Sequence, residues 1–202
     1  NFLYPNKILE EKGLIHQKGF PISYDFEKLS KTINAIKKGE AIITPYYDHS
    51  ISDISTHRKE LIKKELKILI FEGANLLNPQ HTFDQELENK SQYRSISNYL
   101  NYSIYVDAQE KHLIHWFLSR LHQKRSYWKT MNHNNPHLSN LRKKLIQMSH
   151  LEFERFALKN WWYPTNHINL KKHILPYKCR ANLILTKNIK HKIINILEFD
   201  KL

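Results

Sequence analysis

A short run of residues, Leu66-Lys67-Ile68-Leu69-Ile70-Phe71, is apolar except at Lys67 and stops at Glu72-Gly73. Aliphatic side chains that do not alternate with polar ones are typical of a strand covered on both faces, as in a parallel sheet. The carboxyl end of such a strand borders the crevice where α/β proteins bind ligands. The run therefore predicts a central strand over residues 66–72, with the Glu72 carboxylate at a ligand-binding edge.

The composition is that of a folded protein. Of the 202 residues, 41% are hydrophobic and 12% are aromatic, which suits one ordinary domain with a substantial core. The apolar stretches are too short to cross a membrane and no secretory signal opens the sequence, so we expect a cytoplasmic protein with no membrane partner. The single cysteine, Cys179, excludes an internal disulfide.

The chain is strongly basic, with 32 Lys and Arg against 19 Asp and Glu, a net charge of +13. The basic residues are spread along the sequence and form no single stripe, so we expect no nucleic-acid partner; attraction for an anionic nucleotide explains the charge as well. Among the 13 histidines, His112 and His115 lie three apart, but no H-E-x-x-H motif is present. No metal site is predicted from the histidines.

Helices and strands are predicted to alternate along the chain. The predicted elements are a helix from residue 25 to about 38, an extended segment at 41–47, strands at 66–72, 102–107 and 183–186, and helices from about 108 to 124 and 140 to 159. Residues 58–64 suit either a short charged helix or a hairpin, and residues 126–139 are expected to form a flexible lid or loop. This order predicts an α/β layer fold with a mostly parallel sheet, in one domain over residues 1–202.

Six groups of motifs occur in a fixed order: Asn1-Phe2-Leu3-Tyr4-Pro5-Asn6 with Lys18-Gly19-Phe20-Pro21-Ile22-Ser23-Tyr24-Asp25; Pro45-Tyr46-Tyr47-Asp48-His49; Ile68-Leu69-Ile70-Phe71-Glu72-Gly73-Ala74-Asn75-Leu76-Leu77; Ile104-Tyr105-Val106-Asp107-Ala108; the helix with Trp116 and Arg120; and Asn169-Leu170-Lys171-Lys172-His173-Ile174-Leu175-Pro176 running on to Leu183-Ile184-Leu185-Thr186-Lys187. In this order and spacing they resemble the bacterial type I pantothenate kinase family, a branch of the P-loop kinases. The resemblance implies a three-layer P-loop kinase-like fold and the ATP-dependent phosphorylation of pantothenate, the first step of coenzyme A biosynthesis.

The resemblance also implies an incomplete kinase. No G-x-x-x-x-G-K-[ST] phosphate loop occurs in the 202 residues. In the family, this loop and a catalytic Asp precede the position that matches Asn1. We therefore expect a carboxyl-terminal portion that lacks the N-terminal strands and the phosphate loop and does not turn over alone. The complete protein is expected to be a homodimer that coenzyme A inhibits at the ATP site.

Glu72 and Arg120 are the catalytic candidates that the resemblance implies. Mg²⁺ neutralises the phosphates of ATP in phosphoryl transfer, and Glu72 is expected to hold this ion directly or through water. Arg120 follows Trp116 by four residues on one side of a helix, where its guanidinium is expected to reach the transferring phosphate. His191 matches a family histidine near the adenine. Structural roles stay open for all three: a cap or turn contact for Glu72, a surface ion pair for Arg120, and a basic tail for His191.

Four residues are implied to bind pantothenate. Tyr47 and His49 lie two apart and so share one face of an extended segment. Asn169 is expected to bind the carboxylate or amide end of pantothenate, or else to cap the short helix of residues 169–174. Phe117 stands where the family commonly has a Tyr that touches the substrate, and it lacks that hydroxyl.

Three residues leave the choice of acceptor open, and the first is Phe117. Leu121 and Lys124 also replace aromatic residues that line the pantothenate pocket of the family. One alternative is a related P-loop kinase that acts on a nucleoside such as uridine. Another is a non-enzymatic remnant that binds a partner or nucleic acid through its +13 charge.

Overall fold

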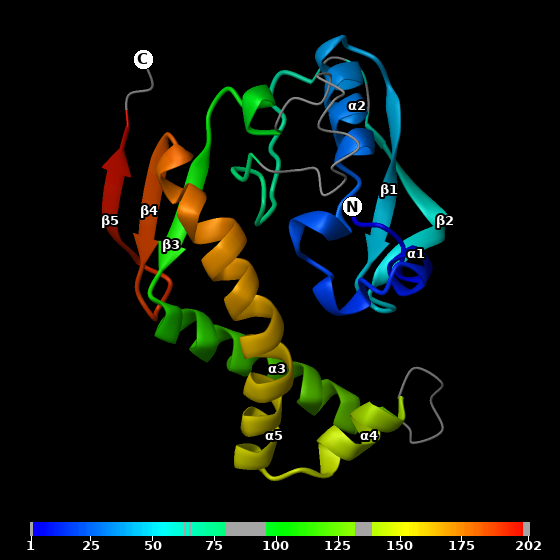
Figure 1. Cartoon of the computed structure of the whole chain (residues 1–202), viewed down its shortest axis with the longest axis vertical. Coiled ribbons are helices and arrows are strands. Elements are labelled where there is room, and N and C mark those ends of the chain that lie inside the picture. Colours follow the sequence, from blue (N-terminus) through cyan, green and yellow to red (C-terminus); the bar gives the residue numbers. More distant parts are fainter. Residues whose placement is uncertain (1, 63, 65, 80–95, 132–138, 200–202) are drawn as a thin grey trace. The chain divides into compact units, whose positions relative to one another are not determined.

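The computed structural model describes residues 2–62, 64, 66–79, 96–131 and 139–199 (Figure 1). The chain divides into two compact units. One unit comprises residues 1–102 and 169–180, and the other comprises residues 103–168 and 181–202. The prediction of a single domain stays a prediction, and each unit is described by itself.

The first unit combines two helices with a hairpin. Its regular elements are α1 (Asn6–Glu11), α2 (Phe26–Lys37), β1 (Ile42–Asp48) and β2 (Asp53–Ile62). Short 3₁₀ or π-helical segments complete it at Ile15–Gln17, Pro21–Ser23, Ile96–Tyr99, Leu170–Ile174 and Leu175–Arg180. The predicted start of α2 is confirmed, because the Asp25 carboxylate accepts a hydrogen bond from the Lys28 backbone N–H at 2.9 Å. The buried apolar face of α2 packs on Ile96 to form a small core.

The sequence was compatible with either a helix or a hairpin over residues 58–64. In the structure, this segment belongs to β2 of an antiparallel hairpin as far as Ile62. Tyr47 of β1 pairs with Ile54 of β2, and Asp48 pairs with Asp53. The register is irregular between Pro45 and Tyr47, as expected where proline offers no N–H to the ladder.

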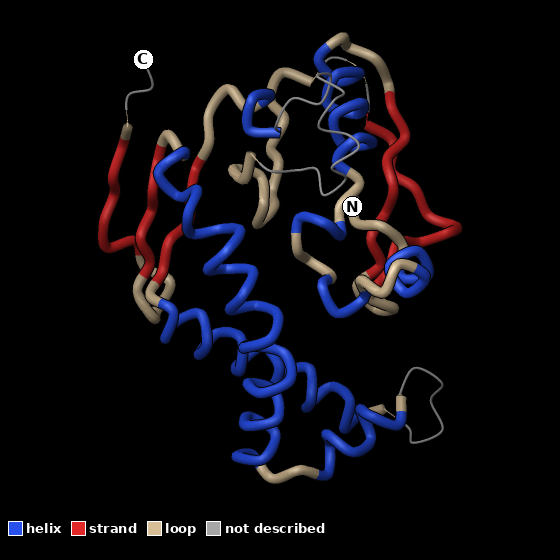
Figure 2. The backbone as a smooth tube through the Cα atoms, viewed as in Figure 1, coloured by secondary structure: helices blue, strands red, loops and turns tan. Residues whose placement is uncertain are grey.

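The predicted strand over residues 66–72 is wrong. Residues 66–73 have no regular secondary structure (Figure 2), and the side chains of Ile68 and Ile70 are 80% and 87% exposed. A central strand is stable only when neighbouring strands satisfy its backbone N–H and C=O groups. Among the described residues no strand pairs with this segment, so its apolar sequence alone does not make it a strand. Unlike the exposed side chains of Ile68 and Ile70, the Phe71 side chain is partly buried and packs against the α2 core.

The second unit contains a sheet and three helices. The sheet has the strand order β3 (Ile104–Ala108), β4 (Leu183–Lys187) and β5 (Ile193–Glu198). The helices are α3 (Glu110–Thr130), α4 (Asn140–Gln147) and α5 (His150–Ala157), and α5 runs on into a π-helical segment, Leu158–His167. The predicted strands at 102–107 and 183–186 are confirmed as β3 and β4, and they pair in parallel. Mostly parallel pairing was predicted, whereas β1–β2 and β4–β5 are antiparallel.

Two helix boundaries differ from the prediction. Helix α3 runs to Thr130, so the first part of the predicted loop at 126–139 is helical; Trp128 packs beneath the Arg142 guanidinium of α4 at 5.3 Å. Residues 132–138 lie outside the described residues. The helix predicted over 140–159 is broken at Ser149, which forms a capping box with Glu152 and begins α5.

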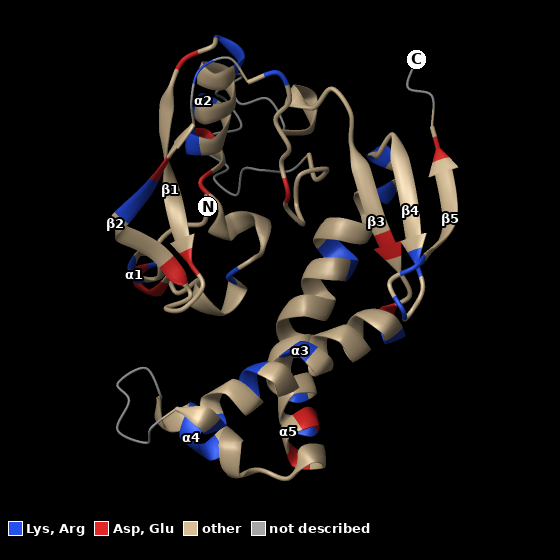
Figure 3. Ribbon diagram, turned by 180° about the vertical axis from the view of Figure 1, so that it is seen from behind, with Lys and Arg blue, Asp and Glu red and all other residues tan. Residues whose placement is uncertain are grey.

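In the part of the chain that the structure describes, no helix has both the length and the apolar character needed to span a bilayer. Lys and Arg occur on elements of both units, and Asp or Glu residues lie beside them on β2 and α5 (Figure 3).

Candidate functional site

Two adjacent residues, Lys18 and Gly19, link the predicted acceptor residues of the first unit. The Lys18 ammonium lies 5.2 Å from the centre of the Tyr47 ring. The Gly19 carbonyl accepts a hydrogen bond from the Asn169 amide at 3.0 Å. Segments far apart in the sequence, β1 and the residues from Asn169 onward, therefore meet at one short turn of the chain.

The Tyr47 side of this site is partly buried and polar. The Tyr47 ring contacts His49 edge to face, with ring centroids 5.0 Å apart, as expected for residues on one face of an extended segment. Burial raises the pKa of the Tyr47 hydroxyl, and the Asp53 charge raises it further. The hydroxyl is therefore protonated at neutral pH and can donate a hydrogen bond. Burial also lowers the pKa of Lys18, and the Asp53 charge opposes this shift.

Asp53 itself holds the hairpin in place. Its Oδ1 accepts hydrogen bonds from the backbone N–H groups of Asn6 and Ile54 at 2.9 and 2.8 Å. Lys18 donates to the Asn6 side-chain oxygen at 2.6 Å and to the Ser52 carbonyl. These contacts fix the Lys18 ammonium next to Tyr47. Asp53 is thus a structural residue of the site, and its negative charge raises the pKa of both Lys18 and Tyr47.

Asn169 does not cap a helix. Its backbone is helical and its side chain makes no capping bond; the amide instead donates to Gly19. The backbone of Gly19 has φ +96°, a conformation that favours glycine. The Asn169 Oδ1 is buried, and among the described residues it has no hydrogen-bond donor.

Asn75 is a second amide of the same kind, and sequence reasoning missed it. It is 3% exposed, it donates to the same Gly19 carbonyl at 2.9 Å, and its buried Oδ1 also has no donor among the described residues. Unsatisfied buried polar atoms are uncommon and indicate a missing partner. The available signal was the position of Asn75 in the Ile68–Leu77 motif, three residues after Glu72.

Glu72 is exposed at the start of this loop. The described residues make no hydrogen bond or ion pair to its carboxylate, so they do not show the alternative role as a cap or turn contact. An exposed carboxylate suits Mg²⁺, which keeps most of its water ligands and needs one or two carboxylates. The residues present therefore fit the ion chemically.

The second unit holds the remaining candidates. Phe117 packs against the buried Trp162 with ring centroids 5.3 Å apart, and Arg120 is exposed one turn further along α3. His191 stacks on Trp116 at 4.1 Å with an interplanar angle of 19°. The Trp116 indole N–H donates to the Ile189 carbonyl at 2.9 Å, which fixes this pair of rings.

The structure thus groups the predicted site residues within their own units. Tyr47, His49 and Asn169 are linked through Lys18-Gly19 in the first unit, where Glu72 begins the loop that carries Asn75. Phe117 and Arg120 lie on α3 of the second unit, which also carries the Trp116–His191 stack.

The chain matches the family model "Phosphoribulokinase / Uridine kinase family" over residues 17–151. It belongs to this family of P-loop kinases. Within the family, it is 38% identical over 193 residues to the pantothenate kinase of Coxiella burnetii strain RSA 493, and 35% identical over 201 residues to that of Yersinia enterocolitica. It is also 38% identical over 193 residues to the pantothenate kinase of Streptococcus suis. Each alignment covers 95% of this chain and 57% of the relative, so the chain spans little more than half their length.

Solved kinases share the fold. A D-glycerate 3-kinase from Cryptococcus neoformans matches with a TM-score of 0.57 at 15% identity, covering 98% of this chain and 77% of the other. A putative fructose transport system kinase from Silicibacter matches with a TM-score of 0.51 at 22% identity, covering 76% of this chain and 64% of the other. These matches confirm the predicted P-loop kinase-like α/β fold.

Proposed function

We propose that the chain is the acceptor-binding portion of an ATP-dependent pantothenate kinase, which forms 4'-phosphopantothenate in the first step of coenzyme A biosynthesis. The observation that carries this proposal is the Lys18-Gly19 turn, which brings Tyr47 and Asn169 together. The pantothenate kinases that share 35–38% identity with the chain support the choice of acceptor.

The polar groups of this turn suit pantothenate, which carries two hydroxyls, an amide and a carboxylate. Tyr47 offers a protonated hydroxyl as a donor. Asn75 and Asn169 each have a buried Oδ1 that lacks a donor among the described residues. These oxygens suit the amide N–H or the hydroxyls of pantothenate, because a carboxylate would face another acceptor. His49, in contact with Tyr47, completes the acceptor-binding set.

Glu72 and Arg120 are the proposed catalytic residues. Glu72 would hold Mg²⁺, and the bound ion supplies charge neutralisation for the phosphates of ATP. Arg120 is free to swing toward solvent because its side chain is exposed. Its fixed positive charge would stabilise the negative charge that the transferring phosphoryl group carries in the transition state.

We propose that residues of the second unit bind the adenine of ATP. His191 and Trp116 form a stacked pair that suits the adenine ring, with Lys187 5.7 Å from the centre of the indole. We propose that the complete protein is a cytoplasmic homodimer and that coenzyme A inhibits it at the ATP site. Phe117 packs on Trp162 and would contact the acceptor through its ring alone.

Binding measurements on residues 1–202 test the acceptor site directly. Pantothenate titrated into the chain, followed by NMR or calorimetry, should bind about fivefold to tenfold more weakly to Tyr47→Phe and Asn169→Ala, the loss of one hydrogen bond. The matched control is Tyr46→Phe, whose ring packs under Arg58 at 4.0 Å. Equal affinity for the wild type and for both site variants would contradict the proposal.

Turnover is tested on the complete gene product that contains residues 1–202. ADP release should depend on pantothenate, and residues 1–202 alone should give none. Pantothenate-dependent activity of the 202 residues alone would contradict the expectation that they are an incomplete kinase.

A nucleoside kinase is the second candidate, because the matched family includes uridine kinases and because Phe117, Leu121 and Lys124 leave the acceptor open. ADP release that depends on uridine and not on pantothenate would favour it. A non-enzymatic remnant is the third candidate. Steeply salt-dependent binding to DNA, without nucleotide binding by the complete gene product, would favour that reading.

A further inference from the structure

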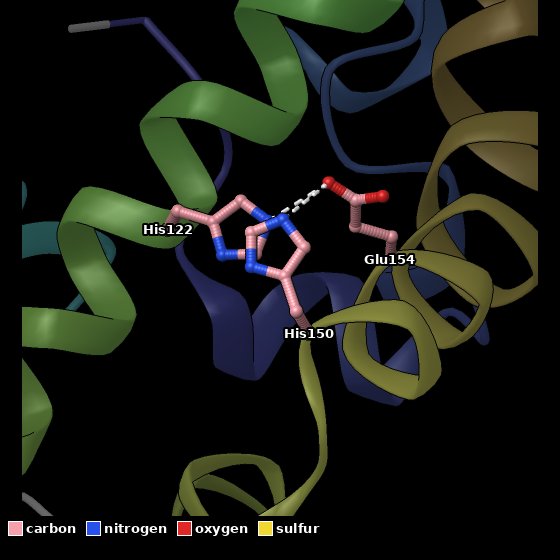
Figure 4. A group of neighbouring side chains, drawn as sticks. All are labelled: His122, His150 and Glu154. Atoms are coloured by element: carbon pink, nitrogen blue, oxygen red, sulfur yellow. Dashed lines mark hydrogen bonds and ion pairs between the residues drawn. The ribbon is translucent and has the colours of Figure 1, made fainter.

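Three side chains that no kinase role uses converge between two helices of the second unit. Figure 4 shows His122 on α3 facing His150 and Glu154 on α5. The Glu154 Oε1 lies 3.0 Å from Nε2 of His122 and 3.1 Å from Nε2 of His150. The two imidazole rings are stacked, with centroids 3.9 Å apart and an interplanar angle of 5°.

We propose that His122, His150 and Glu154 form a binding site for a divalent ion of the Zn²⁺ type. One nitrogen from each imidazole and one oxygen from the carboxylate lie within 4.8 Å of one another. Ligands bonded to Zn²⁺ at about 2.0–2.1 Å in a tetrahedron are separated by about 3.3 Å. The two nitrogen–oxygen distances are close to this value, and binding requires the stacked rings to rotate until both nitrogen lone pairs point at the ion.

The donor set selects the kind of ion. Imidazole nitrogens with a carboxylate suit Zn²⁺, Co²⁺ or Ni²⁺, whereas Mg²⁺ and Ca²⁺ prefer oxygen ligands. The site is therefore chemically distinct from the Mg²⁺ proposed at Glu72. Three protein ligands leave a fourth tetrahedral position. The His150 side chain is 73% exposed, so water has access to the site and can take that position.

The surrounding residues hold the three ligands in place. His150 and Glu154 are four apart on α5, so they share one face of the helix. The capping box of Ser149 and Glu152 fixes the helix start beside His150. His122 packs on the buried ring of Phe153, with ring centroids 5.2 Å apart.

The link between α4 and α5 is also fixed. Buried Arg125 of α3 donates to the carbonyls of Ile146 and Met148, immediately before α5. An ion at the site would add a bond between α3 and α5, and would stabilise the second unit when bound. The helices that carry the three ligands are thus held in place, and binding of an ion should measurably raise the stability of the second unit.

The test compares Zn²⁺ binding by metal-free chains of residues 1–202, all carrying Cys179→Ser to remove the exposed thiol. The wild-type site should bind Zn²⁺ with a dissociation constant at least about tenfold lower than His150→Gln or Glu154→Gln. Zn²⁺ should also raise the Tm of the wild type by more than that of either variant. His150 is exposed, so His150→Gln leaves the fold intact.

Two controls make the result specific. His115→Gln, exposed on α3 about 10.5 Å along the helix from His122, should bind Zn²⁺ as the wild type does. Co²⁺ should give visible absorption bands in the wild type and in His115→Gln that are absent from His150→Gln. Equal Zn²⁺ affinity in the wild type and His150→Gln would overturn the proposal.

Discussion

Asn75 and Asn169 donate to one and the same acceptor, the carbonyl oxygen of Gly19, at 2.9 and 3.0 Å. The shared acceptor ties the loop after Glu72 and the segment after Asn169 to the Lys18-Gly19 turn. Each of the two amides also has a buried Oδ1 without a donor among the described residues.

The substitution Asn75→Asp should destabilise the first unit by about 2–3 kcal/mol, because it replaces the donor to Gly19 with a buried carboxylate. Urea unfolding measures the effect. The matched control is Asn101→Asp, whose side chain is exposed, and which should change the free energy of unfolding by less than about 0.5 kcal/mol. Equal changes in the free energy of unfolding for the two substitutions would show that the hydrogen bond from Asn75 to Gly19 does not stabilise the first unit.

Two arginines on α3 should separate stability from activity. Arg125 is buried and donates to the Ile146 and Met148 carbonyls, so Arg125→Met should cost about 2–4 kcal/mol of unfolding free energy. Exposed Arg120→Met should leave the stability within about 0.5 kcal/mol. In the complete gene product, Arg120→Met should lower kcat by about a hundredfold or more if the guanidinium stabilises the transferring phosphate. Wild-type kcat in Arg120→Met would remove Arg120 from the mechanism.

The substitution Glu72→Gln in the complete gene product should lower kcat about a hundredfold or more and raise the Mg²⁺ concentration needed for activity, because an amide binds the ion weakly. Glu11→Gln, at the exposed end of α1, is the control and should behave as the wild type does. Steady-state kinetics over a range of Mg²⁺ concentrations measures both effects. An unchanged rate and Mg²⁺ dependence would exclude Glu72 as a ligand.

His173 should make the first unit less stable in acid. Burial lowers the pKa of its imidazole, and the Lys172 charge lowers it further. The unfolded chain therefore binds the proton first as the pH falls through about 6.5, so this contribution to stability is present above that pH and lost below it. Urea midpoints at about pH 7.5 and 5.5 should differ less in His173→Gln than in the wild type.

The control for this measurement is His57→Gln, whose side chain is exposed on β2. It should retain the pH response of the wild type. The same response in His173→Gln and in the wild type would assign the acid sensitivity to other groups. His173 lies against Phe20, with ring centroids 5.6 Å apart, so Gln is chosen to preserve part of that packing.

Sequence reasoning succeeded where the determining contacts are local. The cap at Asp25 joins it to Lys28, three residues on, and the apolar spacing of α2 is read within one helix. The strands at β3 and β4 carry their own β-branched and aromatic residues. The break before α5 was also encoded locally, in the Ser149–Glu152 capping box, and was missed.

Sequence reasoning failed where partners lie far away along the chain. The run from Leu66 to Phe71 has the composition of a buried strand, yet its backbone has no strand partner in the described part of the chain. Asn75 lies in the Ile68–Leu77 motif, but no neighbouring residue indicates that it shares the Gly19 carbonyl with Asn169.

By itself the sequence determined the class of fold, most of the helices and strands, and the family to which the chain belongs, since periodicity, caps and motif order are properties of neighbouring residues. Tertiary structure alone decided the hairpin ending at Ile62, the meeting of Tyr47 with Asn169 at Lys18-Gly19, and the grouping of His122 with Glu154. Each of these depends on side chains or backbone groups brought together from distant positions, and no local pattern records which distant residue will be the partner.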